Sequence, residues 1–69
     1  MAFSYKPLWK LLIDKNINKK SLMQLTGISK STMDKMYREK YVALSVIDRI
    51  CESLDCEVSD VIAHKKVVE

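Results

Sequence analysis

The chain contains one glycine and one proline, and this scarcity of turn-forming residues constrains its fold more than any other feature. A sheet sandwich or a barrel needs many tight turns, which depend on Gly, Pro, Asn and Asp. Of the 69 residues, 48% are hydrophobic and 30% are charged, which is too apolar for a disordered segment. The sequence therefore predicts a single small domain, residues 1–69, built from a few short helices.

Five stretches of the sequence show the spacing of apolar residues that is typical of amphipathic helices. The first begins where Ser4 can cap a helix and where Pro7 is tolerated in the first turn. Residues 39–43 are expected to form a loop. The run Tyr41-Val42-Ala43-Leu44 has the composition of a strand, but no nearby segment is suited to pair with it. We expect an all-α fold, a compact bundle of five short helices at about residues 5–15, 19–26, 30–38, 44–54 and 58–62, with a core spanning 5–64 and a tail at 65–69.

The single glycine, Gly27, separates the second and third predicted helices. Glycine enters the left-handed conformation without steric cost and is the commonest helix stop. Asn18 and Ser29 are good N-caps for the helices on its two sides. A helix, a sharp turn and a second capped helix make a helix-turn-helix, here at about residues 19–38. That geometry turns the second helix outward, where its N-terminal half can enter the major groove of DNA.

The predicted helix at 30–38 is apolar on one side only. Met33, Met36 and Tyr37 are expected to face the core, while the opposite side is polar and charged. That side offers hydrogen-bond donors and acceptors to a ligand close to the helix N-terminus. Trp9, beside the apolar stripe of the first helix, is expected at the edge of the core or in contact with a partner.

Charge is distributed unevenly along the chain, although the net charge is only +3. Residues 1–41 contain nine Lys and Arg against three Asp and Glu, whereas residues 42–69 contain three against six. A basic part on a small protein suggests a polyanion as its partner. Because this part coincides with the predicted helix-turn-helix, nucleic acid is favoured over a merely solvated lysine surface.

Two stretches together carry a resemblance to a known family. The first runs Leu22…Thr26-Gly27-Ile28-Ser29-Lys30-Ser31-Thr32-Met33, and the second runs Leu44…Ile47…Ile50-Cys51…Leu54-Asp55-Cys56, followed by Asp60-Val61-Ile62. Over about residues 5–64 the chain resembles the lambda repressor/Cro-like helix-turn-helix regulators, the XRE family. The resemblance implies a lambda repressor-like DNA-binding domain that binds an operator in double-stranded DNA sequence-specifically and regulates transcription, with repression as the expected sense.

The resemblance also implies which side chains contact DNA. In that family the third helix reads bases, whereas the start of the second helix and the residues after the third hold phosphates. Lysine suits guanine O6 and N7, serine can donate or accept, and aspartate can accept from cytosine N4. Carried over by position, the base-reading residues are Lys30, Ser31, Thr32 (facing a base or a phosphate), Asp34 and Lys35, and the phosphate-binding residues are Asn18, Lys19, Arg38 and Lys40.

Four positions depart from the family pattern. Met23 stands where a small Ala is usual, and Lys19 replaces the usual Gln while keeping a phosphate donor as a point charge. Glu39 stands where Gly commonly follows the recognition helix, which predicts a different helix end. Ala43 stands where the fourth helix usually has a Ser or Thr cap.

The sequence offers no set of side chains suited to catalysis or to metal binding. Cys51, Cys56 and the single histidine, His64, make a poor set of metal ligands, and the two cysteines are expected to pack as small hydrophobes. No apolar run approaches a membrane span, and the N-terminus lacks the pattern of a signal peptide. We therefore expect no enzyme activity, cofactor, metal, small-molecule ligand or membrane partner, and a cytoplasmic, nucleoid-associated protein.

A second function remains open on the sequence alone. The chain could be a protein-docking module, or an antitoxin-like subunit with a degenerate helix-turn-helix. The lysines would then be a solvated face, and the interface would be formed by Trp9, Tyr41 and the Val67-Val68 pair.

The length of one recognition helix bears on the oligomeric state. Such a helix covers only about half of a binding site, and half-sites repeat about one helical turn apart. The sequence therefore predicts a two-fold homodimer on DNA, formed through the helix at 58–62 and the tail at 65–69.

Overall fold

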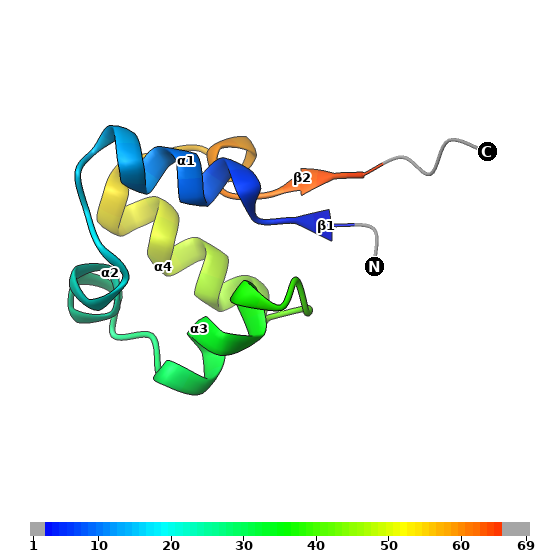
Figure 1. Ribbon diagram of the computed structural model, residues 1–69, viewed down its shortest axis with the longest axis horizontal. Coiled ribbons are helices and arrows are strands. Elements are labelled where there is room, and N and C mark those ends of the chain that lie inside the picture. The colour runs from blue at the N-terminus through cyan, green and yellow to red at the C-terminus, as the bar shows by residue number, and fades with distance from the viewer. Residues whose placement is uncertain (1–2, 66–69) are drawn as a thin grey trace.

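The computed structural model describes residues 3–65, which contain four α-helices, one turn of 3-10 helix and two short paired strands (Figure 1). Each of the four α-helices lies within a residue of its predicted bounds at both ends. In chain order the elements are β1 (Phe3–Ser4), α1 (Lys6–Asp14), α2 (Lys19–Thr26), α3 (Lys30–Tyr37), α4 (Leu44–Leu54), η1 (Val58–Asp60) and β2 (Ala63–His64).

The expected compact, mainly helical fold is confirmed, but the expected fifth helix is wrong, and a small two-stranded sheet is present instead. The chain instead forms the single turn η1 at Val58–Asp60, and β2, which follows at Ala63–His64, pairs antiparallel with β1. Phe3 lies opposite His64 and Ser4 opposite Ala63. A five-residue segment can form few helical hydrogen bonds, whereas strand pairing satisfies backbone groups that would otherwise need another partner. The pairing holds the first and last described segments together beside α1 (Figure 1).

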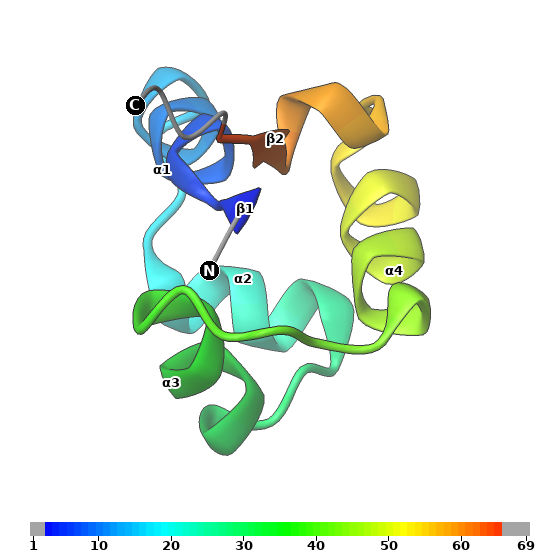
Figure 2. The same cartoon turned by 90° about the vertical axis from the view of Figure 1, so that its right-hand side faces the viewer.

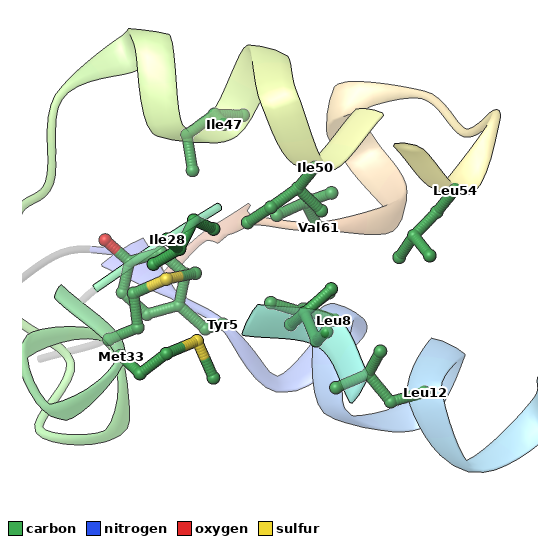
Figure 3. Packing of buried hydrophobic residues seen from close by; sticks show 11 residues of the cluster. Tyr5, Leu8, Leu12, Ile28, Met33, Ile47, Ile50, Leu54 and Val61 are labelled. Carbon is green, nitrogen blue, oxygen red and sulfur yellow. The ribbon is translucent and has the colours of Figure 1, made fainter. Parts of the chain in front are cut away.

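The four α-helices and the residues just outside them share one hydrophobic core. From α4, Leu54 points toward Leu8 and Leu12 of α1, and Ile47 points toward Ile28 (Figure 3). Helix α1 contributes residues four apart, which is the spacing of one helical face. The buried hydrophobic side chains are Tyr5, Leu8, Leu12, Leu22, Ile28, Met33, Met36, Ile47, Ile50, Leu54 and Val61.

The start of α1 is tied to the loop that follows α3. Ser4 lies one residue before the N-cap, Tyr5, and its Oγ accepts a hydrogen bond from the backbone N–H of Lys6 at 3.2 Å. The buried Tyr5 hydroxyl donates to the backbone carbonyl of Lys40 at 2.8 Å. Burial raises the pKa of Tyr5, so this donor keeps its proton at neutral pH. The loop therefore has a fixed anchor in the core.

No helix among residues 3–65 combines the length and the apolar character that a bilayer crossing requires.

Candidate nucleic-acid interface

The two helices around Gly27 have the geometry of a helix-turn-helix. Helix α2 begins at the N-cap Asn18, whose Oδ1 accepts from the backbone N–H of Ser21 at 2.7 Å. It ends at Gly27, whose φ is +71°. A Cβ at Gly27 would meet no atom within 4 Å, so the turn requires glycine for its backbone conformation and not for space. The predicted helix stop and the Asn18 cap are confirmed.

Helix α3 starts at a compact group of hydroxyls around Ser29. The Ser29 Oγ accepts from the backbone N–H of Thr32 at 3.3 Å, which confirms the predicted N-cap. The same oxygen lies 3.1 Å from the hydroxyls of both Ser31 and Thr32. These contacts hold the first turn of α3 in a defined shape. They also engage two of the predicted base-reading side chains with Ser29.

The two methionines of α3 and most of its polar side chains lie on the sides predicted for them. Met33 and Met36 are buried, and Thr32 is half-buried. Four of the predicted base-reading side chains are exposed on the other side, namely Lys30, Ser31, Asp34 and Lys35. All four predicted phosphate-binding residues are exposed as well: Asn18, Lys19, Arg38 and Lys40. Helices α2 and α3 lie together at one end of the molecule, away from η1 (Figure 2).

Tyr37 does not face the core as predicted. Its side chain is 65% exposed. Met36 already occupies the interior at this end of α3, so the Tyr37 ring lies on the surface and packs edge-on against Trp9, with ring centroids 5.8 Å apart. The Lys19 ammonium lies 3.1 Å from the centre of the Tyr37 ring. The helical period alone could not reveal this contact, because it joins three helices.

A family model for the Cro/C1-type helix-turn-helix DNA-binding domain matches residues 7–66. The chain belongs to this family. The crystal structure of the transcriptional regulator VanUg (Form II) is similar to this Cro/C1-type domain, with a TM-score of 0.91 and 41% identity. The match covers 96% of this chain and 88% of that one. No curated protein sequence matches at a significant level. The resemblance to the Cro-like regulators is thus confirmed.

Glu39, which stands where the family commonly has Gly, does not give α3 the different end that its sequence predicted. In this Cro/C1-type domain Glu39 adopts the left-handed conformation that glycine favours, with φ of +58°. The backbone N–H of Lys40 then reaches back to the carbonyl of Lys35 at 2.8 Å and closes the helix. The Glu39 carboxylate pairs with the Lys65 ammonium, and this hydrogen bond lowers the pKa of Glu39. The loop is thereby joined to the residue after β2.

The cysteines of the Cro/C1-type domain lie apart from this surface. Cys51 and Cys56 are both half-buried free thiols that pack against the core. Burial, with a smaller contribution from Cys51, raises the pKa of Cys56 to about 11. Within residues 3–65, no three His, Cys, Asp or Glu side chains converge into a metal site.

Proposed function

We propose that this Cro/C1-type domain is a transcriptional regulator that binds a specific operator in double-stranded DNA. The observation that carries the proposal is the two-sided helix α3. Its methionines anchor it in the core, and its polar side projects outward from a capped turn beside α2. The similarity to the transcriptional regulator VanUg supports the regulatory role. The proposed sense of regulation is repression. The proposed location of the protein is the cytoplasm, at the nucleoid.

The proposed roles follow the chemistry of each exposed group. Lys30 and Lys35 donate to guanine, Asp34 accepts from cytosine, and Ser31 either donates or accepts. Thr32, whose hydroxyl contacts Ser29, faces a base or a phosphate. The proposed phosphate-binding residues are Asn18 and Lys19 at the start of α2, and Arg38 and Lys40 after α3. Such contacts set the register of the protein on DNA without reading sequence.

We further propose a two-fold homodimer on DNA. The C-terminal surface that would form it is not the helix expected from the sequence. Because the expected helix is absent at 58–62, η1 and β2 take its place in the proposed interface, together with the tail. The rest of the tail, including the Val67-Val68 pair, lies outside the described residues.

A binding-site selection from random duplexes, followed by mobility shift with salt titration on the promoter of the chain's own operon, tests the function. We expect one enriched sequence and an affinity that falls steeply with salt, since each neutralised phosphate contributes about 0.9 to the slope. A transcription assay on that promoter then tests repression. Lys10→Ala, an exposed lysine of α1 outside both proposed sets, is the matched control.

The protein-docking alternative is supported by a separate observation. Several large apolar side chains are exposed, including Ile13 at 78% and Leu44 at 80%. Failure to bind any duplex even at low salt would reject the DNA proposal and favour docking.

A further inference from the structure

Lys19 is held in an unusual setting for a lysine on a basic surface. It is the first residue of α2, directly after the N-cap Asn18. Its ammonium lies over the Tyr37 ring, 3.1 Å from the ring centre, and 5.7 Å from the centre of the Trp9 ring. The two rings pack edge to face. Helices α1, α2 and α3 therefore each supply one member of this group.

The surroundings of Lys19 are mostly apolar. Together with Trp9 and Tyr37 it lines an open hollow of about 480 Å³, whose other lining residues are Leu12, Ile13, Ile17 and the N-cap Asn18. No carboxylate lines this hollow, and among residues 3–65 no acidic side chain forms an ion pair with Lys19. The electron-rich ring faces, and not an anion, hold this cation in place.

This difference matters for an ammonium that has to meet a phosphate. A carboxylate partner would neutralise the charge and would have to be displaced by DNA. An aromatic ring leaves the charge intact, and an ammonium has three donors, so some stay free for phosphate oxygens. A lysine also loses much rotamer freedom when it is fixed, and a side chain ordered beforehand reduces that cost on binding.

We propose that Tyr37 and Trp9 form an aromatic platform that positions Lys19 for a DNA phosphate at the start of α2. Tyr37 is a positioning residue, because it acts through Lys19 and not through a contact of its own with DNA. This inference rests on the proposed function. It explains how the chain uses a flexible lysine at this position, where the shorter and neutral glutamine is usual in the family.

A double-mutant cycle on duplex DNA tests the platform, with Tyr37→Leu, Lys19→Met and the combination of both. A random-sequence duplex is a sufficient probe, because a phosphate contact does not depend on sequence. We expect Tyr37→Leu to weaken binding about two- to five-fold, the range of an exposed cation–π contact. In the Lys19→Met background the same change should have no further effect. Tyr37→Phe, which keeps the ring, should bind like the wild type.

Tyr41→Leu is the matched control, because Tyr41 is as exposed as Tyr37, at 64% against 65%, and packs near Phe3 instead. It should leave the affinity unchanged. A readout without DNA supports the cycle. In the free protein the Lys19 methylene protons next to the nitrogen should be shifted upfield by the ring current, and Tyr37→Leu should abolish this shift. Thermal melting of each variant identifies any loss of folding, in which case Tyr37→Phe and the proton shift still decide.

Three outcomes overturn the platform. The first is an additive cycle, the second is tighter binding by Tyr37→Leu, and the third is Lys19 protons at ordinary shifts in the wild type. If the wild type binds DNA with a normal salt slope and one of these appears, only the platform fails. If the wild type binds no duplex at all, the proposed function fails with it.

Discussion

Among single residues, Lys35 offers the sharpest distinction between reading a base and holding a phosphate. It is exposed in the last turn of α3, on the side opposite the buried methionines. If it donates to a guanine, Lys35→Ala should relax the preference at one base-pair position and cost about 1–3 kcal/mol against the preferred base. Binding-site selection with the wild type and the variant measures this change.

The control for Lys35 is Lys10→Ala, which removes the same charge from α1, where Lys10 lines a hollow together with Ser59 and Asp60 of η1. It should leave both the consensus and the preference at each position intact. A Lys35→Ala variant that selects the unchanged consensus at a uniformly lower affinity would move Lys35 into the phosphate set.

At Cys56, the raised pKa predicts slow chemistry. With a pKa of about 11, the thiol carries little thiolate at pH 8 and should be alkylated about 100-fold more slowly than free cysteine. The folded state keeps this proton to higher pH than the unfolded chain does. The corresponding stabilisation is therefore present below about pH 8.5 and is lost as the pH rises through about 11. Alkylation by iodoacetamide across this range, resolved by peptide mass mapping, measures the rate. A rate equal to that of a free thiol contradicts the prediction.

The exposure of Tyr37 could not be predicted from the sequence of α3 alone. Its position on the helix, next to one buried methionine and four residues after another, correctly places it near the apolar side of α3. The helical period cannot tell which of two adjacent side chains fills the core and which remains outside. That choice depends on Trp9 and Lys19, which come from two other helices.

Among the elements, α4 has a defect that one atom would correct. Its N-cap, Ala43, has the extended backbone of a capping residue, with φ of −62° and ψ of 146°, but no side-chain oxygen to accept a hydrogen bond. Ala43→Ser should therefore stabilise the domain by about 1 kcal/mol and raise the melting temperature by roughly 4–8 °C. Thermal unfolding followed by circular dichroism measures the gain.

Ala43→Val is the comparison, because it adds γ atoms at the N-cap without a hydrogen-bond acceptor. It should give no gain in melting temperature. Equal melting temperatures for the Ser variant and the wild type would show that the first backbone N–H groups of α4 are already satisfied by water.

The elements also show why four helices were predictable and the strands were not. A helix end depends on residues within one turn of it, as Asn18, Gly27 and Ser29 illustrate. The pairing of β1 with β2 joins segments separated by most of the chain, and each is only two residues long. Neither segment has enough alternation to predict a strand alone. Val58, Val61 and Ile62, just before β2, have the spacing of one helical turn, and the sequence therefore predicted a helix there.

For the whole molecule, the proposed dimer makes a prediction about its operator. If two chains bind together, the spacing of the half-sites should matter as much as their sequence. Inserting about 5 bp between them turns one half-site by half a helical turn, and should weaken binding by about 10²-fold, the lower range of linked binding. Mobility shift on duplexes with and without the 5-bp insertion measures the loss of affinity.

An insertion of about 10 bp is the control, because it restores the facing of the half-sites and changes only their distance. It should bind better than the 5-bp insertion. Affinity that ignores the spacing altogether would show that each chain binds its half-site alone.

The pairing of Phe3 with His64 makes the described fold nearly a ring. The two described ends meet beside the loop after α3, where Phe3 contacts Tyr41 and Lys65 forms an ion pair with Glu39. Following the helices in chain order therefore leads back to the place where the first strand begins. The link between the ends could be closed and the chain cut elsewhere, for example in the exposed turn at Asn16, with every helix keeping its neighbours. A circular permutant that begins after Asn16 should therefore keep the same fold.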